Sequence, residues 1–356
     1  MSQLPMSTNL NQILLKAKDI EVGFPIIEGF VQAVRGVSFD IIHGKTLALV
    51  GESGSGKSVT ARALMGMLSE RAVVGKNALV EFSGEQLIGL PEERLQKIRG
   101  SAISMIFQEP MTSLNPLYTV GSQIMESILA HQKMPKKEAR LSALRLLQEV
   151  RIPRPEARLD QYPHQLSGGQ RQRVMIALAI ANEPKLLIAD EPTTALDVTI
   201  QAQILRLIKD LQAKYGMSVL LITHDLNVVR KTSEHICVMR NGEIVERGLT
   251  EEVFTNPKHP YTKHLIQSEP KGTPPPLQGE PPTSLQGDKV RVVFKIRHGS
   301  FFNRKTEDLV AVNDVSIKVR QSESVGVVGE SGSGKTTLGL ALIRLISSQG
   351  GEILFG

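Results

Sequence analysis

One stretch of this chain occurs twice, and each time it has the form of a phosphate-binding loop. The letters GESGSGK run from Gly51 to Lys57 and again from Gly329 to Lys335. Apolar positions around the two copies also match, as Val34 does with Val312. Self-similarity of this kind indicates one domain type present twice, so the fold must provide a nucleotide-binding loop in each copy.

The first copy fits the pattern G-x-x-x-x-G-K-[ST] in the expected context. It follows the apolar run TLALV and precedes a helical run, which predicts a strand, a loop and a helix. Backbone N–H groups of such a loop surround a phosphate, and the helix N-terminus adds a favourable dipole. We expect Lys57 to reach the β and γ phosphates of ATP and Ser58 to bind Mg²⁺. The predicted nucleotide contacts in this loop are Gly51, Glu52, Ser53, Gly54, Ser55, Gly56, Lys57 and Ser58.

The first domain is predicted to be of the α/β class and to span residues 14–268. Short runs rich in Val, Ile and Leu alternate with helical patterns, which indicates a parallel sheet covered by helices. TLALV, KLLIA and SVLLIT are the expected central strands. From Thr119 to Val150 the pattern is helical, with Pro135 placed to begin a helix, so a helical insertion is predicted there.

A linker is predicted at residues 269–288, because its prolines and glycines cannot sustain a helix or a strand. The second copy then covers residues 289–356. It supplies a loop with Gly329, Gly334, Lys335 and Thr336, whose chemistry suits phosphate and Mg²⁺. VGVVG within it is expected to be a central strand without the strands that would flank it, so this truncated copy is predicted to be only marginally stable alone.

Two further segments carry candidate chemistry in the first copy. LLIADEP is an apolar strand ending in two carboxylates, where Asp190 can support the Mg²⁺ shell and Glu191 can face the attacking water. LSGGQ precedes a long helix, and Ser167 is the expected N-cap. That segment is either an ordinary capped helix or an anion-binding helix N-terminus.

These motifs, in this order, resemble the ATP-binding cassette (ABC) family, whose hallmark is LSGGQ. Gln108 in MIFQEP resembles its Q-loop glutamine, residues 194–197 its D-loop, and His224 in LITHD its switch histidine. The resemblance implies a P-loop NTPase with a RecA-like parallel core sheet, an antiparallel β subdomain and a helical insertion, plus an incomplete second copy. It implies ATP and Mg²⁺ as ligands, with catalytic roles for Glu191, His224 and Gln108, and metal contacts from Ser58, Gln108 and Asp190.

Family resemblance also implies that two cassettes pair head to tail. Each ATP would then lie between the phosphate loop of one cassette and the signature of the other, here Ser167, Gly168, Gly169 and Gln170. The adenine is expected to stack on an aromatic side chain upstream of the loop. Phe24 is the candidate, with Phe30 as a competitor and a purely structural core phenylalanine as the alternative.

The amino-acid sequences of several segments resemble those of the dipeptide and oligopeptide importers, especially the fused tandem ATPases of the microcin C type. NPKHPYTKHLI resembles the C-terminal extension of that subfamily, here about residues 250–268. The resemblance implies two transmembrane permease subunits, a separate substrate-binding protein and a peripheral position on the cytoplasmic face of the bacterial inner membrane. A second cassette would come from another chain or from self-pairing.

Composition limits the partners, covalent links and kinds of site that this chain can have. The net charge of +6 is spread along the chain, so nucleic acid is not an expected partner. Cys237 is the only cysteine, which excludes an intrachain disulfide or a multi-cysteine cluster. The N-terminal sequence lacks the pattern of a secretory signal. The sequence also contains no uninterrupted apolar run of about 18 residues, the length needed to span a membrane. The remaining alternatives are a soluble ABC ATPase of DNA repair or translation and a non-hydrolysing or inactive truncated subunit.

Overall fold

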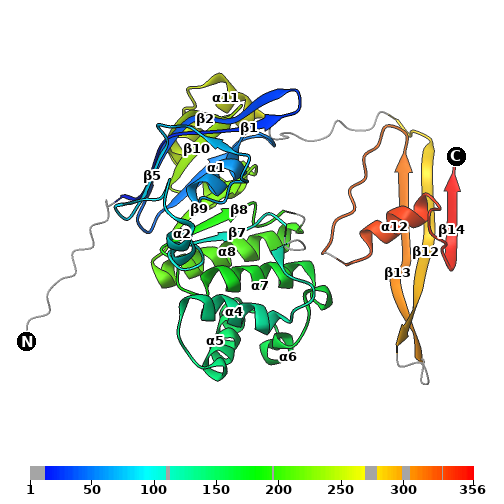
Figure 1. Ribbon diagram of the computed structural model, residues 1–356. Coiled ribbons are helices and arrows are strands. Elements are labelled where there is room, and N and C mark those ends of the chain that lie inside the picture. Colours follow the sequence, from blue (N-terminus) through cyan, green and yellow to red (C-terminus); the bar gives the residue numbers. More distant parts are fainter. Residues whose placement is uncertain (1–12, 110–112, 195, 269–278, 299–304, 331) are drawn as a thin grey trace, which may run out of the picture. The chain divides into compact units, whose positions relative to one another are not determined.

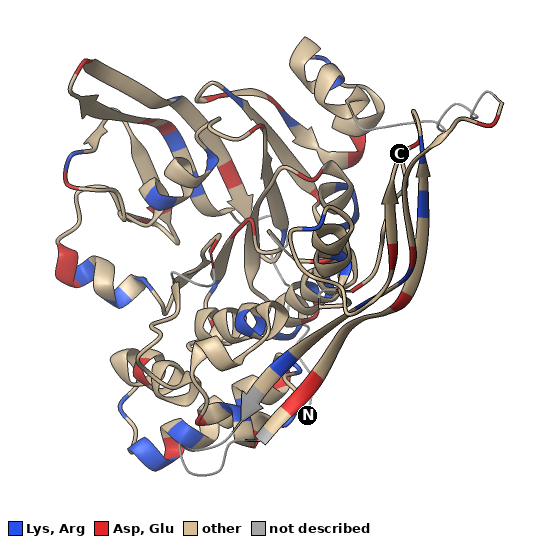
Figure 2. Cartoon of the chain, turned by 90° about the vertical axis from the view of Figure 1, so that its right-hand side faces the viewer, with Lys and Arg blue, Asp and Glu red and all other residues tan. Residues whose placement is uncertain are grey.

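The structure, a computed structural model, describes residues 13–109, 113–194, 196–268, 279–298, 305–330 and 332–356 (Figure 1). The chain forms two compact units, Met1–Pro270 and Lys271–Gly356. Basic and acidic residues are interspersed along the helices and strands of both units (Figure 2). Within the described ranges, no helix is both long enough and apolar enough to cross a lipid bilayer.

A six-stranded sheet forms the centre of the first unit, in the order β11-β10-β3-β9-β8-β7. Five neighbouring strands are parallel, and β11 runs antiparallel to β10 at one edge. All residues of β3, β8 and β9 are buried, which confirms TLALV, KLLIA and SVLLIT as central strands. The strand bounds are β3 Thr46–Val50, β7 Ile103–Ile106, β8 Leu186–Asp190, β9 Ser218–Thr223, β10 His235–Arg240 and β11 Glu243–Leu249.

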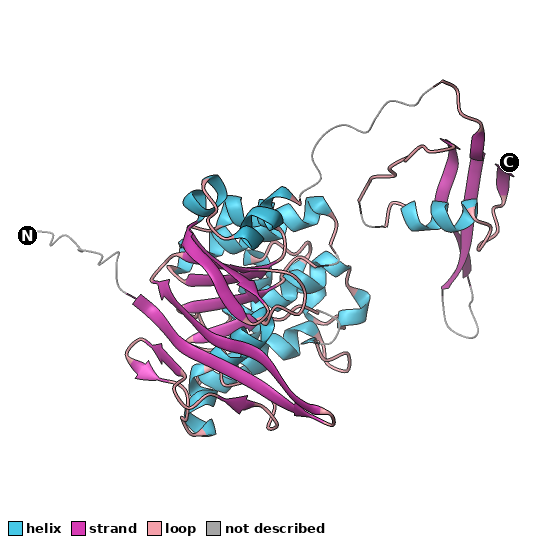
Figure 3. Cartoon of the chain, turned by 90° about the horizontal axis from the view of Figure 1, so that it is seen from above, coloured by secondary structure: helices cyan, strands magenta, loops and turns pink. Residues whose placement is uncertain are grey.

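An antiparallel sheet packs beside this core, as the family resemblance implies. The long strands β1 and β2 run side by side (Figure 3), and the sheet order is β2-β1-β5-β6, with β4 paired to β1. Helix α1 contributes Ala61 and Leu64 to a core shared with both sheets. The bounds are β1 Ile13–Ile26, β2 Gly29–Ile42, β4 Val73–Val74, β5 Leu79–Phe82, β6 Glu85–Gln86, α1 Lys57–Leu64 and α2 Glu92–Ile98.

The predicted helical insertion is confirmed and extends further than the sequence pattern indicates. Thr119 caps its first helix by accepting a hydrogen bond from the Ser122 N–H, and Pro135 directly precedes the second helix. A shared apolar core joins this insertion to the long helices α7 and α8. The bounds are α4 Val120–His131, α5 Lys136–Glu149, α6 Pro155–Leu159, η1 Pro163–Gln165, α7 Gly168–Ile180 and α8 Val198–Tyr215.

Three short helices complete the first unit on the β10–β11 side of the sheet. They share a small core with β3 and β10, whose members include Val50, Ile236 and Tyr261. The last of these helices falls within the segment that resembles the importer extension. The bounds are α9 Leu226–Thr232, α10 Thr250–Thr255 and α11 Pro260–Gln267.

The second unit is a small sheet, in the order β13-β12-β14, with helix α12 packed on it. Strand β12 starts at Thr283, so the end of the segment assigned to a linker is paired in a sheet instead. Pro282 is the last proline before it, and the residues that follow can donate ladder hydrogen bonds. The bounds are β12 Thr283–His298, β13 Lys305–Arg320, α12 Lys335–Leu342 and β14 Gly350–Phe355.

The expectation of a strand at VGVVG in the second unit is wrong. Residues 325–329 have no strand conformation, and the Val327 and Val328 side chains are 46% and 91% exposed. The equivalent β3 is hydrogen-bonded on both sides, to β9 and to β10. A parallel strand depends on its neighbours for every ladder hydrogen bond, and the described part of this unit offers no such neighbours to VGVVG.

Cys237 lies in β10 with 2% of its surface exposed, and burial raises the pKa of its thiol to about 12. Because the thiolate is the reactive form, we expect alkylation in the folded chain to be at least about 100-fold slower than in the denatured chain. Mass spectrometry after timed iodoacetamide treatment, with and without denaturant, measures the ratio. Equal rates in the two conditions would show that β10 opens readily.

Candidate nucleotide site

The phosphate loop of the first unit connects β3 to α1, and two of its glycines are required by close backbone contacts. A Cβ atom on Gly51 would lie 2.2 Å from the Met239 carbonyl oxygen at the end of β10. On Gly56, which has a φ of 100°, it would lie 2.6 Å from the Ala33 carbonyl oxygen on β2. Neither carbonyl can move away without disturbing a strand, so the loop keeps its course only with glycine at both positions.

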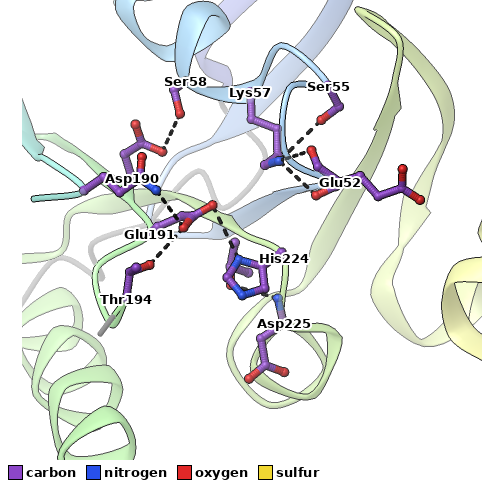
Figure 4. A network of polar contacts seen from close by, with 12 residues as sticks. Glu52, Ser55, Lys57, Ser58, Asp190, Glu191, Thr194, His224 and Asp225 are labelled. Carbon is purple, nitrogen blue, oxygen red and sulfur yellow. Dashed lines mark hydrogen bonds and ion pairs between the residues drawn. The ribbon is translucent and has the colours of Figure 1, made fainter. Parts of the chain in front are cut away.

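Lys57 places its ammonium group inside this loop (Figure 4). Its Nζ donates to the carbonyl oxygens of Gly51 and Glu52, at 2.9 and 2.7 Å, and to Ser55 Oγ at 3.3 Å. Only 5% of the residue is exposed, and burial lowers the pKa of Lys57, opposed by the nearby carboxylates of Glu191 and Asp190. The loop therefore holds a positive charge at the point where the sequence predicts phosphate contact.

Ser58 and Asp190, two of the three predicted metal contacts, lie together. Ser58 Oγ, on the first turn of α1, donates to Asp190 Oδ1 at 3.0 Å. Asp190 ends β8 with 2% of its surface exposed, and burial raises the pKa of this carboxyl group. A hydroxyl and a carboxylate are oxygen ligands of the kind that Mg²⁺ prefers, and a cation would offset the cost of burying this carboxylate. The residues present therefore fit the expected metal.

Glu191 is the centre of a polar network that joins three segments distant in sequence (Figure 4). Its Oε2 accepts hydrogen bonds from Gln108 Nε2 at 3.0 Å and from Thr194 Oγ1 at 2.9 Å. His224 Nδ1 lies 3.4 Å from Oε1. These residues follow β7, β8 and β9, whose C-terminal ends meet at one edge of the parallel sheet. The structure thus brings together all three residues predicted to be catalytic.

Two features of this network go beyond the sequence prediction. Gln108, expected near the metal, directs its amide N–H to Glu191. The sequence pattern places Thr194 only in a segment that resembles a D-loop, yet its hydroxyl also orients Glu191. The signal for this contact is the spacing of Glu191 and Thr194, since a carboxylate can accept from a hydroxyl three residues later in a tight turn. The Thr194 N–H also donates to the Glu191 carbonyl, at 3.2 Å, which closes that turn.

The Glu191 backbone has a φ of 45°, in the left-handed region. For a residue with a Cβ atom this conformation costs roughly 1–2 kcal/mol. It is stabilised by the Glu191 N–H, which donates to the Ile222 carbonyl on β9 at 2.9 Å. Glu191 directly follows the central strand β8, and strained backbone of this kind occurs more often at functional sites than elsewhere.

The signature segment forms the N-terminus of α7. Ser167 Oγ accepts from the Gln170 N–H at 3.3 Å, and Gln170 Oε1 accepts from the Ser167 N–H at 3.2 Å. This capping box confirms Ser167 as the N-cap. Gly168 and Gly169 form the first turn, and a Cβ on Gly169 would lie 2.9 Å from Ile200 Cγ2 on α8. A role for these residues toward a nucleotide held by another cassette remains a prediction.

The aromatic candidates for the adenine lie at the tip of the β1–β2 hairpin. Phe24 is partly buried and packs against the core that contains α1. Phe30 is 53% exposed, and its ring lies on Gly23, where a Cβ would be 2.1 Å from the ring. Phe24 therefore has a packing role in the structure, and its contact with the base stays a prediction.

The second unit reproduces the loop around its lysine. Lys335 Nζ donates to the carbonyl oxygens of Gly329 and Glu330, at 2.7 and 2.6 Å, and Gly334 begins α12 with a φ of 90°. Thr336 follows on the first turn of that helix. Among the described residues of this unit, however, no strand corresponds to β8, which carries Asp190 and Glu191 in the first unit.

Two family models match the chain. The model of the ABC transporter covers residues 34–194 and 312–356. The model of the oligopeptide/dipeptide transporter C-terminal region covers residues 245–296. The first match therefore occurs in both copies of the repeat, and the second includes α11.

Curated relatives are similar over almost the whole chain. The peptidoglycan transport ATP-binding protein YejF of Agrobacterium fabrum is 53% identical over 345 residues, which are 97% of this chain and 63% of that protein. The glutathione import ATP-binding protein GsiA of Shigella boydii is 46% identical over an alignment of 373 residues that covers 96% of this chain and 60% of that protein. The chain thus spans less than two thirds of the length of these relatives.

Solved structures with the same fold include the dimeric post-hydrolysis state of the cassette MJ0796 bound to ADP and Pi. It has a TM-score of 0.60 and 31% identity, and it covers 66% of this chain and 98% of its own. The cbiO1 structure from Clostridium perfringens has a TM-score of 0.58 and 26% identity, over 72% of this chain and 99% of its own. From the two-copy family match, the site geometry and these relatives, we conclude that the chain belongs to the ABC transporter family.

Proposed function

We propose that the first unit binds ATP with Mg²⁺ and hydrolyses it to drive a transporter. One observation carries this proposal. The carboxylate of Glu191, with only 15% of its side chain exposed, is held by Gln108, Thr194 and His224 at the sheet edge that also presents Lys57. A carboxylate fixed beside a buried ammonium group suits the positioning of water next to a bound phosphate.

Each residue of this site has a distinct role in the proposed hydrolysis of ATP. Lys57 and the loop N–H groups bind the phosphates, and Glu191 orients a water molecule and accepts its proton as the water oxygen attacks the γ-phosphorus. The bond between that phosphorus and the oxygen of ADP breaks, which yields ADP and inorganic phosphate. His224 and Gln108 hold the carboxylate and supply donors near the transferred group. Mg²⁺, held by Ser58 and Asp190, would neutralise phosphate charge.

The signature residues are proposed to act on a second nucleotide. Ser167 and Gln170 cap α7, so this helix presents a fixed N-terminus with its partial positive charge. We propose that it faces the γ-phosphate bound by a partner cassette, and that Gly168 and Gly169 allow close approach. The solved cassette structures that resemble this chain include dimeric ones, which supports the pairing of two cassettes. The partner would be a second ABC cassette, and a second copy of the first unit is one candidate.

The transporter is proposed to be a peptide importer. This rests on the match of residues 245–296 to the oligopeptide/dipeptide transporter C-terminal region and on the names of the import ATPases among the relatives. The proposed partners are two membrane-spanning permease subunits and a separate substrate-binding protein. The chain would then act at the cytoplasmic face of the bacterial inner membrane, as a peripheral subunit.

Uptake of radiolabelled peptides by a deletion strain tests this function. We expect uptake to be lost on deletion and restored by the wild-type gene, but not by a gene that encodes Lys57→Ala, because that ammonium binds the phosphates. Lys97→Ala, at an exposed lysine of α2, is the matched control and should restore uptake. Unchanged uptake in the deletion strain would refute the assignment to peptide import.

A further inference from the structure

Helix α11 of the C-terminal extension reaches the phosphate loop through one side chain. Tyr261 lies on the first turn of α11 with 5% of its surface exposed, among residues of β3 and β10. Its hydroxyl oxygen accepts a hydrogen bond from the Glu52 N–H at 3.3 Å. Glu52 is the second residue of the loop and lies 209 positions earlier in the chain. The extension is thereby in direct contact with the nucleotide-binding machinery.

Tyr261 is itself held from several sides. Both carboxylate oxygens of Glu246, on β11, accept backbone hydrogen bonds just before α11, from Lys258 at 2.7 Å and from His259 at 3.0 Å. His259 then caps α11, because its Nδ1 accepts from the Tyr261 N–H at 3.2 Å. The Arg240 guanidinium lies 4.8 Å from the centre of the tyrosine ring. The backbone hydrogen bonds hold the start of α11, and the apolar core and Arg240 enclose the ring, so the fold rather than a free rotamer determines the position of its hydroxyl.

Glu52 links Tyr261 to the lysine of the phosphate loop. The Glu52 N–H is held by Tyr261, and the Glu52 carbonyl oxygen accepts from Lys57 Nζ at 2.7 Å. The peptide group between Gly51 and Glu52 is therefore held both by Tyr261, through its N–H, and by Lys57, through its carbonyl oxygen, and Lys57 also holds the next peptide group. Burial raises the pKa of Tyr261, so the phenol stays neutral and no negative charge develops beside the phosphates.

We propose that Tyr261 is a positioning residue that holds the Gly51–Glu52 part of the phosphate loop, so that nucleotide affinity depends on the C-terminal extension. This inference rests on the proposed function, because it assumes that the loop binds ATP. A purely structural role for Tyr261 requires only its ring, which fills the small core with Val50 and Val238. The hydroxyl group distinguishes the two roles.

The test uses Tyr261→Phe, which keeps the ring and the contact with Arg240 but removes the hydroxyl. The full chain is titrated with a fluorescent ATP analogue and Mg²⁺, in a Lys335→Ala background so that the second loop does not contribute. We expect affinity to fall about three- to tenfold, the range for loss of one hydrogen bond. Hydrogen exchange of the segment containing Glu52, measured by mass spectrometry, should become faster because that N–H loses its acceptor.

Tyr215→Phe is the matched control, because it removes a tyrosine hydroxyl that donates to Glu149 far from the loop. It should change neither the affinity nor the exchange of the loop segment. Unchanged affinity in Tyr261→Phe would overturn the inference, whatever its melting temperature. Lack of nucleotide binding by the parent chain would instead overturn the proposed function, and the exchange measurement would still decide whether Tyr261 holds the loop.

Discussion

Replacing Glu191 with glutamine is expected to slow ATP hydrolysis by about 100- to 10,000-fold, the usual contribution of a positioned general base. Glutamine has the same shape, and its amide oxygen can still accept from Gln108 and Thr194 as Glu191 Oε2 does. Its amide group can donate to His224 Nδ1, which lies 3.4 Å from the other carboxylate oxygen, when the ring proton of His224 is on Nε2. The network is therefore preserved, and only the ability to take a proton is lost.

Steady-state phosphate release at saturating ATP measures this effect. Glu81→Gln, at an exposed position of β5, provides a control with the same chemical change outside the site. It should hydrolyse ATP at the wild-type rate. A Glu191→Gln variant as fast as the control would show that another group activates the water, and the role given to this carboxylate would be wrong.

Replacing Lys57 with alanine is expected to weaken ATP binding by about 10- to 100-fold, as for loss of charged hydrogen bonds to phosphate. The buried ammonium group also organises the loop, because it binds the carbonyl oxygens of Gly51 and Glu52 and the hydroxyl of Ser55. Alanine leaves these oxygens without that donor. The variant therefore loses both the charge that faces the phosphates and part of the loop geometry.

Equilibrium titration with the fluorescent nucleotide measures this loss, again with the second loop disabled by Lys335→Ala. Lys97→Ala, on the exposed face of α2, removes one lysine charge away from the site and should bind as the parent chain does. Retention of parent affinity by Lys57→Ala would contradict the assignment of this loop as the nucleotide site. Circular dichroism of each variant confirms that the comparison is between folded chains.

Much of the first unit could be predicted from the sequence because its signals are local. The loop glycines, the buried runs before and after them and the capping serine of α7 each depend on neighbours within a few residues. Asp190 and Glu191 were identifiable because they stand at the end of an apolar run that predicts a buried strand, and His224 because LITHD resembles a motif of the ABC family. The order of the motifs then sufficed to place them in one site.

Other features depend on contacts that sequence patterns do not record. The link from Tyr261 to Glu52 joins distant segments through one hydroxyl, and the short motif HPYT gives no indication of its target. VGVVG has the composition of a central strand, yet without paired neighbours it forms none. Composition also placed the end of the linker too late, because the strand that starts at Thr283 is defined by its pairing with β13 and β14.

The central claim is that ATP bound at the Lys57 loop is cleaved with the help of Glu191. The most direct measurement identifies the nucleotide that remains on the chain after incubation with ATP and Mg²⁺ and rapid gel filtration. We predict ADP on the parent chain and intact ATP on Glu191→Gln, both in the Lys335→Ala background. ADP on both chains would contradict the account, as would the absence of nucleotide from both.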